Sequence, residues 1–301
     1  MSSTTPVSLN SHDHIMHVVS KYDTFLLDCD GVLWQGNVLI SGVADTLKML
    51  RSMGKRILFV TNNSTKSRND YQKKLSSLGL QASVDEIFGS SYAAAYYIAH
   101  QLKFPANKKV YVSGMEGICH ELEEQGIRYC GGQEDNENIS TADLENIKPD
   151  PEVGAVLFGF DININYKKLA KAFTYVNSNP DCHFIATNGD LTYPTAGTVF
   201  PGTGAMVEAL AASLRRRPII LGKPHQVMLD VIVNKCHLDR SRTCMVGDRL
   251  DTDIAFGKLG GLATLLVMTG VTSKAELDAS DIIPDYVIDS FGNVGDQLTN
   301  A

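Results

Sequence analysis

The chain has 301 residues, of which 44% are hydrophobic, enough for one large globular domain or two modest ones. Lysine and arginine number 27 against 34 aspartate and glutamate residues, which gives a net charge of -7. This acidic balance disfavours nucleic acid and anionic membranes as partners, so we expect a small-molecule or protein partner.

The opening residues 1–17, MSSTTPVSLNSHDHIMH, are polar and lack the apolar core of a signal peptide. No window of the sequence approaches the roughly 20 apolar residues that cross a bilayer. Six scattered cysteines form no C-x-x-C pair, and we interpret them as reduced thiols. These features predict a cytoplasmic protein without a membrane-spanning segment.

Short apolar runs followed by small and polar residues recur along the chain, and helical patterns alternate with them. The runs are TFLLDCDG, KRILFVTNNS, RPIILGKP, RTCMVGD and ATLLVMTG. Such runs are typical of strands buried on both faces of a parallel sheet, and the alternation indicates βαβ units. The sequence therefore predicts a doubly wound, Rossmann-like α/β core, in which ligands bind beyond the carboxyl ends of the strands.

A long insertion separates the second of these runs from the third. The stretch between Asn63 and Lys223 is far too long to be a single loop. It contains the strand-like runs KKVYVSG, VGAVLFGF and CHFIATN, the helical pattern YKKLAKAFTYV, and the polar loop-like stretch GGQEDNENISTADLENIKPDPE. We therefore expect a discontinuous core domain of residues 1–102 and 216–301, with an α/β cap domain of residues 103–215 inserted into it.

Acidic residues follow two of the core runs where the strands are expected to end. Asp28 and Asp30 follow the first run, and a second cluster contains Asp248, Asp251 and Asp253. Carboxylates this close repel each other and resist burial unless a cation lies between them. Because no histidine or cysteine grouping accompanies them, the pattern favours Mg²⁺ over zinc. Asp251 is more typical of a surface or helix N-terminal carboxylate than of a ligand.

A lysine and a Thr-Asn-Asn turn supply donors of the kind that a phosphoryl group needs. Lys223 follows RPIILG, and Thr61, Asn62 and Asn63 close the run KRILFVTNNS. An ammonium, a hydroxyl and backbone N–H groups match the oxygens of a phosphoryl group. Together with the expected Mg²⁺ site, these donors predict phosphoryl transfer.

The motifs DCDGVLW, FVTNNS, LGKP and MVGDRLDTD, in this order, resemble the four ordered motifs of the haloacid dehalogenase superfamily of phosphatases. The insertion between the second and third motifs resembles the branch with an α/β cap at that position. That branch contains p-nitrophenylphosphatases, phosphoglycolate phosphatases and pyridoxal phosphatases, and the resemblance is strongest to fungal members of the first two groups. It spans nearly the whole chain and is weakest in the cap and in residues 1–20.

The resemblance implies that Asp28 is the nucleophile that forms an aspartyl-phosphate and that Asp30 is the general acid and base. Mg²⁺ would bind the Asp28 carboxylate, the Asp30 backbone carbonyl and the Asp248 carboxylate, with Asp253 in support. Lys223 would offset negative charge and orient Asp28.

The remaining roles concern the phosphoryl group and the substrate. Thr61, Asn62 and Asn63 would bind phosphoryl oxygens, with the backbone of Asn62 among the donors. The cap segment TNGDLTYPTAG, residues 187–197, is the expected specificity segment. Where pyridoxal phosphatases carry a histidine, this chain has Tyr193, which favours a small phosphorylated metabolite such as 2-phosphoglycolate, with p-nitrophenyl phosphate as an artificial substrate. The resemblance also implies a homodimer that forms through the cap.

Two other functions remain open at this point. One is a phosphoprotein or phosphopeptide phosphatase, or a phosphotransferase, that uses the same intermediate; a large cap argues against folded substrates but not against flexible peptides. The other is a non-catalytic Mg²⁺-binding interaction module. The presence of Asp30 argues against such a module, because binding alone would not need this carboxylate.

Overall fold

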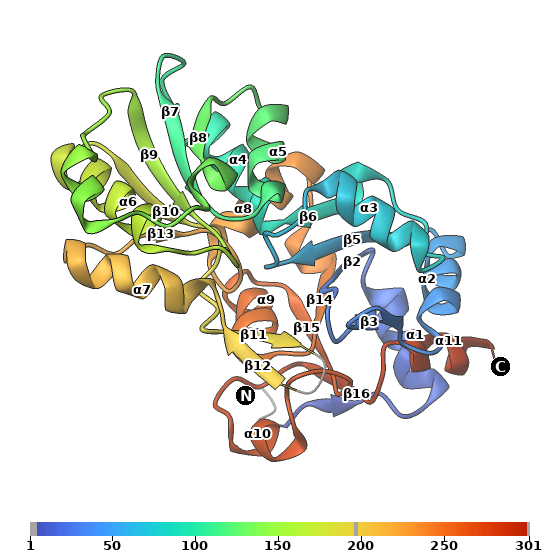
Figure 1. Cartoon of the computed structure of the whole chain (residues 1–301). Helices are drawn as coiled ribbons and strands as arrows, with labels where there is room; N and C mark the ends of the chain where they lie inside the picture. Colours follow the sequence, from blue (N-terminus) through green and yellow to red (C-terminus); the bar gives the residue numbers. More distant parts are fainter. Residues whose placement is uncertain (1–4, 196–197, 300–301) are drawn as a thin grey trace. The chain divides into compact units, whose positions relative to one another are not determined.

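The computed structural model describes residues 5–195 and 198–299 (Figure 1). The chain divides into two compact units. The first unit consists of Met1–Thr61, Gln72–Phe88 and Lys223–Ala301, and the second of Asn62–Tyr71 and Gly89–Gly222. None of the helices within the described ranges combines the length and the apolar character that crossing a bilayer requires.

The first unit is built on a seven-stranded sheet with the order β1-β16-β15-β14-β2-β5-β6. The strands are β1 (Val7–Ser8), β2 (Thr24–Leu27), β5 (Arg56–Thr61), β6 (Ile87–Gly89), β14 (Thr243–Gly247), β15 (Ala263–Val267) and β16 (Tyr286–Ile288), beside a short antiparallel hairpin of β3 (Trp34–Gln35) and β4 (Val38–Leu39). All pairings from β1 to β5 are parallel. The sheet therefore has the parallel topology that the sequence predicts.

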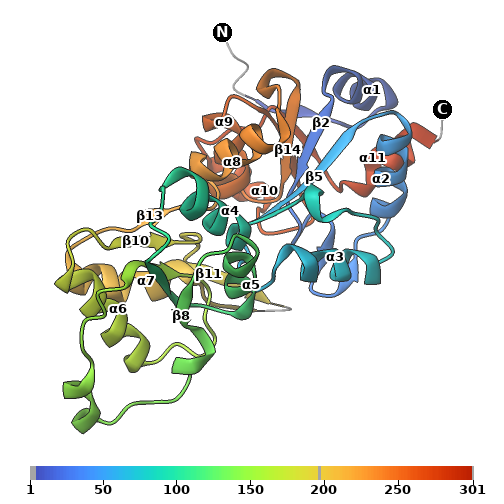
Figure 2. The ribbon, with the colours of Figure 1, turned by 90° about the horizontal axis from the view of Figure 1, so that it is seen from above.

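Helices cover both faces of this sheet, as Figures 1 and 2 show. The helices α1, α2 and α11 pack together on one face, and α8 and α9 lie on the other. The bounds of the unit's helices are α1 (His12–Lys21), α2 (Val43–Ser52), α3 (Arg68–Ser77, which begins in the second unit), α8 (Gln226–Cys236), α9 (Ala255–Leu259), α10 (Lys274–Ala279) and α11 (Gly292–Thr299), with short helical turns η1 (Val84–Glu86), η5 (Arg240–Arg242) and η6 (Leu250–Ile254). Coverage on both faces explains why every residue of β2 and β14 is buried and why both sequences are mainly apolar after an initial threonine.

The second unit has its own five-stranded sheet, with the order β13-β10-β9-β7-β8 and four parallel pairings. The strands are β7 (Lys109–Ser113), β8 (Tyr129–Gly131), β9 (Val153–Phe158), β10 (His183–Ala186) and β13 (Ile219–Ile220), and the helices are α4 (Ser90–Tyr96), α5 (Glu116–Glu124), α6 (Tyr166–Ser178) and α7 (Thr203–Leu214), with helical turns η2 (Tyr97–Gln101), η3 (Gly132–Asp135) and η4 (Thr141–Asn146). The helices α6 and α7 pack on β9 and β10 around an aromatic and aliphatic core. An antiparallel hairpin of β11 (Thr192–Thr195) and β12 (Thr198–Pro201) precedes α7, and residues 196–197 of the expected specificity segment lie outside the described residues.

The predicted α/β fold class is confirmed, but the predicted domain boundaries differ from those of the structure. The sequence predicts that the run RPIILG belongs to the core, whereas its residues Ile219 and Ile220 form β13, which pairs in parallel with β10 at the edge of the second sheet. A local apolar pattern predicts a strand without specifying which sheet it joins. At the other boundary, α4 packs against α5, and the longer segment of the second unit starts at Gly89 rather than at 103.

Candidate active site

The first unit brings the ends of two parallel strands together around carboxylates. Asp28 directly follows β2, and Asp248 directly follows β14. These strands are parallel neighbours with Leu27 opposite Val246, so their carboxyl ends lie at the same edge of the sheet. The backbone N–H of Asp28 donates to the carbonyl of Val246, which fixes the start of the first acidic motif against β14.

Lys223 lies at the centre of the site and is almost fully buried. Its ammonium Nζ is 2.5 Å from Asp28 Oδ1 and 2.7 Å from Asp253 Oδ1, and it donates to the carbonyl of Val60 at 2.9 Å. Burial lowers the pKa of this ammonium, but the charges of Asp253 and Asp28 outweigh burial, so the pKa of Lys223 is raised. The lysine is therefore protonated and is shared between two buried carboxylates.

Asp253 fixes the backbone of the turn after β14, which goes beyond the supporting role toward the metal that the sequence predicts. Its Oδ2 accepts hydrogen bonds from the backbone N–H groups of Asp248 and Arg249, both at 3.1 Å, while its Oδ1 faces Lys223. It thus holds the turn after β14 and contributes charge to the cluster. Asp251, by contrast, is exposed and pairs with Arg249, in agreement with the expected surface carboxylate.

The buried carboxylates form a group that could hold a metal ion. Oxygen atoms of Asp28, Asp248 and Asp253 lie within 4.8 Å of one another. Burial raises the pKa of Asp28 well above its usual range, and Asp253 and Asp248 raise it further against the opposing effect of Lys223. Burial, with the charge of Asp253, also raises the pKa of Asp248 to about 7. The single charge of Lys223 does not balance three carboxylates, so the cluster can accept a further cation. The carboxylate oxygens are ligands that fit Mg²⁺.

Asp30 is half-buried, and its carboxylate is held by an aromatic side chain. The indole Nε1 of Trp34 donates to Asp30 Oδ1 at 2.7 Å, and Lys74 Nζ lies 4.1 Å from the centre of the indole ring. Gly31, the residue after Asp30, has a φ of +85°. A Cβ at this glycine would lie 2.5 Å from Asp248 Oδ2, so the turn after Asp30 requires glycine for both conformation and space.

The predicted phosphate-binding residues divide between the two units. Thr61 is the buried last residue of β5, one position beyond the carbonyl that Lys223 contacts. Asn62 and Asn63 belong to the second unit. The Asn62 side-chain amide donates to both carboxylate oxygens of Asp190 at 3.1 Å, and Asn63 Oδ1 accepts from the backbone N–H and hydroxyl of Thr65.

Tyr193, the predicted specificity residue, lies in β11 of the second unit. It is paired with Phe200 of β12, and its ring stacks on Phe160 with 4.5 Å between ring centres. The stacking fixes the direction of the tyrosine within its own unit, and its role toward a substrate stays a prediction.

Three contributions to the site were missed by the sequence analysis. Trp34 stands within DCDGVLW, but nothing in the motif indicates that its N–H reaches Asp30. The backbone N–H of Val271 donates to Asp248 Oδ2 at 2.7 Å, and a Cβ at Gly270 would overlap the same carboxylate. This glycine closes the run ATLLVMTG, three residues after the end of β15, and a glycine just beyond a predicted strand was the available signal.

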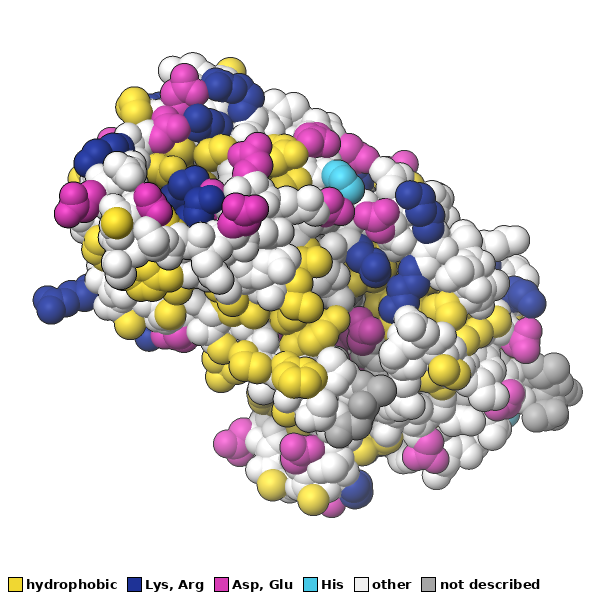
Figure 3. Space-filling model, viewed as in Figure 1, with side chains coloured by type: hydrophobic (Ala, Val, Ile, Leu, Met, Phe, Trp, Pro, Cys, Tyr) yellow, Lys and Arg dark blue, Asp and Glu magenta, His cyan; other side chains and the backbone are white. Residues whose placement is uncertain are grey.

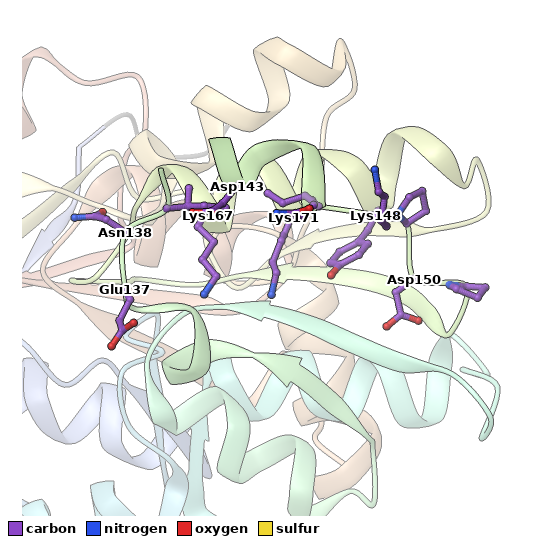
Figure 4. A pocket seen from close by; sticks show the side chains of 13 residues that line it. Glu137, Asn138, Asp143, Lys148, Asp150, Lys167 and Lys171 are labelled. Carbon is purple, nitrogen blue, oxygen red and sulfur yellow. The ribbon is translucent and has the colours of Figure 1, made fainter. Parts of the chain in front are cut away.

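A cavity of about 670 Å³ lies within the second unit, between the loop around Glu137–Pro151 and α6 (Figure 4). Lys167 and Lys171 extend into it, and both pair with the buried carboxylate of Asp135. Three lysines and three acidic residues line the cavity, and none of the predicted site residues does. Without an excess of positive charge, this cavity is poorly suited to binding a phosphate group.

Comparison with known proteins identifies the family. A haloacid dehalogenase-like hydrolase family model matches residues 25–128, and a HAD-hydrolase-like model matches residues 220–294. The chain is 45% identical to 4-nitrophenylphosphatase of Schizosaccharomyces pombe over 96% of this chain and 98% of that protein. It is 48% identical to the chloroplastic phosphoglycolate phosphatase 1A of Arabidopsis thaliana over 89% of this chain and 75% of that protein.

Among solved structures, a glycerol phosphate phosphatase from Mycobacterium tuberculosis in complex with magnesium matches with a TM-score of 0.77 and 28% identity, over 92% of this chain and 77% of that chain. The chain therefore belongs to the haloacid dehalogenase-like hydrolases. Within that family it is a phosphatase, which confirms the resemblance seen in the four motifs and argues against a purely non-catalytic module.

Proposed function

We propose that this phosphatase hydrolyses phosphomonoesters of small metabolites in a Mg²⁺-dependent reaction through an aspartyl-phosphate. The observation that carries the proposal is the buried cluster of Asp28, Asp248 and Asp253 around Lys223, which is short of positive charge. Asp28 and Asp248 carboxylates and the Asp30 backbone carbonyl would hold Mg²⁺, which when bound neutralises charge on phosphoryl oxygens. The relative that was solved with magnesium supports this choice of metal.

In the first half of the reaction, a carboxylate oxygen of Asp28 attacks phosphorus, and the bond from phosphorus to the ester oxygen breaks. The electron pair of that bond stays with the departing oxygen, which takes a proton from Asp30. Lys223 positions the Asp28 carboxylate through its 2.5 Å contact and stabilises the negative charge. Trp34 holds one oxygen of Asp30, so the other oxygen remains for proton transfer.

In the second half, water attacks the phosphorus of the aspartyl-phosphate while Asp30, now ionised, takes the proton of that water. The bond between phosphorus and Asp28 breaks, and inorganic phosphate leaves with the carboxylate restored. The hydroxyl of Thr61 and backbone N–H groups of Asn62 and Asn63 bind phosphoryl oxygens through both halves.

For the substrate we propose 2-phosphoglycolate, with p-nitrophenyl phosphate as an artificial substrate. The similarity to the Arabidopsis phosphoglycolate phosphatase and to the yeast 4-nitrophenylphosphatase supports this choice. The test measures phosphate release by the purified protein from 2-phosphoglycolate, glycerol 3-phosphate, pyridoxal phosphate, p-nitrophenyl phosphate and a phosphopeptide, with Mg²⁺ or with EDTA. Preferred release from 2-phosphoglycolate, lost in EDTA, supports the proposal; preference for the phosphopeptide favours the alternative of a phosphopeptide phosphatase.

Asp30→Asn is expected to slow hydrolysis in a way that depends on the leaving group. Turnover of 2-phosphoglycolate should fall by about 10²-fold or more, because its alkoxide must be protonated as it departs. Nitrophenolate is stable without a proton, so stopped-flow mixing with p-nitrophenyl phosphate should still show an initial burst before slow steady turnover. Asp251→Asn, at the exposed carboxylate paired with Arg249, is the matched control. Equal losses for both esters, without a burst, would contradict the role given to Asp30.

The effect of Mg²⁺ on thermal stability is expected to grow with pH. The pKa of Asp248 rises from 3.8 to about 7 on folding, so the metal-free native state holds more protons than the unfolded state between these values. Metal-free stability should therefore fall as pH rises through this window. Because a proton and Mg²⁺ compete for this carboxylate, Mg²⁺ should raise Tm more at pH 8 than at pH 5.5. Thermal denaturation with Mg²⁺ or EDTA measures this, and equal increases at both pH values would count against the metal site.

We also propose a cytoplasmic homodimer that forms through the second unit. Val199 and Phe200 on β12 are 60% and 55% exposed and supply apolar surface for such an interface. Figure 3 shows hydrophobic side chains gathered on the face that carries this hairpin in Figure 1, while acidic and basic side chains are interspersed elsewhere on it. All six cysteines are unpaired, which supports a reducing compartment.

A further inference from the structure

The loop after β10 and the start of α4 hold Asn62 through several hydrogen bonds within the second unit. Asn188 Nδ2 donates to the carbonyl oxygen of Asn62 at 2.8 Å, and the hydroxyl of Ser90 donates to the same oxygen. Asp190 accepts the two hydrogen bonds from the Asn62 side chain. Asn188 and Ser90 are buried, so these hydrogen bonds are shielded from water.

The loop after β10, which contains Asn188 and Asp190, is itself held by hydrogen bonds. Asn188 Oδ1 accepts from the backbone N–H of Asp190, and the carbonyl of Asp190 accepts from Gly204 at the start of α7. The backbone N–H of Thr187 donates to the carbonyl of Phe158 in β9. The carbonyl of Thr187 accepts from the N–H of Gly222, the residue before Lys223. A Cβ at Gly222 would lie 2.7 Å from Asn62 Oδ1 and 2.8 Å from the Thr187 carbonyl, so the packing around Asn62 leaves no room for a side chain.

The geometry of the peptide bond gives this arrangement a consequence for phosphate binding. The carbonyl of Asn62 and the N–H of Asn63 belong to one planar trans peptide and point in opposite directions. The donors of Asn188 and Ser90 that hold the carbonyl oxygen therefore also fix the direction of the Asn63 N–H. Asp190, by holding the side chain of Asn62, limits rotation of the preceding backbone.

We propose that Asn188 and Asp190 are positioning residues that orient the backbone N–H groups of Asn62 and Asn63 toward the phosphoryl group of the substrate. This inference rests on the proposed function, since it assigns the two side chains to the phosphate-binding turn of that reaction. The residues lie in the segment that continues into β11 and Tyr193, yet their contacts are to the turn that recognises phosphate. They serve the part of the substrate that all phosphomonoesters share.

The test compares Asn188→Asp and Asp190→Ala with Asn138→Asp, a matched control at an exposed asparagine of the same unit. Asn188→Asp replaces the donor with a carboxylate oxygen that repels the Asn62 carbonyl. We expect kcat/KM to fall about 10- to 100-fold, by the same factor for 2-phosphoglycolate and p-nitrophenyl phosphate, and inorganic phosphate to inhibit more weakly. The conservative variant Asp190→Asn, which keeps an acceptor oxygen, should recover much of the activity lost in Asp190→Ala.

A double-mutant cycle adds a readout that a merely structural role would not change. If Asp190 acts through the side chain of Asn62, then Asn62→Ala combined with Asp190→Ala should be no slower than the slower single variant. Wild-type kcat/KM and phosphate inhibition in folded Asn188→Asp and Asp190→Ala, verified by circular dichroism, would overturn the inference. So would a change confined to one substrate, which marks a specificity role. Activity retained by Asp28→Asn would instead refute the proposed function itself, so the two failures are distinguishable.

Discussion

Asp28→Asn is expected to abolish turnover, with a fall in kcat of at least about 10³-fold for every phosphomonoester. The amide that replaces the carboxylate is a poor nucleophile, and the contact of Lys223 Nζ with a charged oxygen is lost. The fold should persist, because the backbone N–H of residue 28 still donates to Val246. Phosphate release and thermal denaturation measure the two effects separately.

A chemical trap tests the intermediate behind this prediction. Hydroxylamine converts an acyl phosphate to a hydroxamate, so wild-type protein quenched during turnover should carry this modification at Asp28, as detected by mass spectrometry. The Asp28→Asn variant should carry none. Asp251→Asn, whose carboxylate is exposed and paired with Arg249, should turn over and be trapped like the wild type. Comparable turnover in Asp28→Asn and the wild type would refute the aspartyl-phosphate mechanism.

Lys223→Met is expected to reduce both stability and activity. The substitution keeps most of the unbranched side chain but leaves the carboxylates of Asp28 and Asp253 without the ammonium that contacts both. Removing one partner of a buried ion pair costs about 3–5 kcal/mol, because a buried charge is left uncompensated. We expect the free energy of unfolding in EDTA to fall by about this amount and kcat with Mg²⁺ to fall by about 10²-fold or more.

Denaturant unfolding in EDTA and in Mg²⁺ separates the structural and catalytic parts of the effect. Mg²⁺ should restore part of the lost stability, because it supplies positive charge to the same carboxylates, but it should not restore kcat. Lys258→Met is the control, since Lys258 pairs with Asp285 at the surface, where an ion pair contributes about 1 kcal/mol or less. Unchanged stability and kcat in Lys223→Met would show that the cluster does not need this cation.

Much of the site was predictable because its charged residues follow strands directly. Asp28 and Asp248 stand at the ends of apolar runs, and parallel strands place such positions at one edge of the sheet. The contact of Lys223 with Asp28 was implied by the family resemblance, and the structure shows it together with a second contact to Asp253. The strand before Lys223 joins the second sheet and not the first, contrary to the prediction. This strand consists only of Ile219 and Ile220, and its pairing with β10 depends on residues that are distant in the sequence.

The rest of the site could not be read from sequence because it depends on groups without a residue-specific signature. The N–H of Val271 that binds Asp248 is a backbone donor that nearly every residue possesses. The hydrogen bond from Trp34 to Asp30 requires the short turn between them to direct the indole back. Likewise, the assignment of Asn62 to the second unit follows from contacts with Asp190 and Asn188, which lie well over a hundred positions away.

The close packing of glycines around the acidic cluster limits how this enzyme could be redesigned. Gly31 and Gly270 both lie against the carboxylate of Asp248, and Gly247 lies against Asp253, so that even a methyl group at any of them would displace a charged side chain. On the β11–β12 hairpin, Val199 and Phe200 are exposed, so these positions can be varied with more freedom. Around the carboxylates, however, the uncharged positions are as constrained as the charged ones, and a library that varies them would consist largely of inactive proteins.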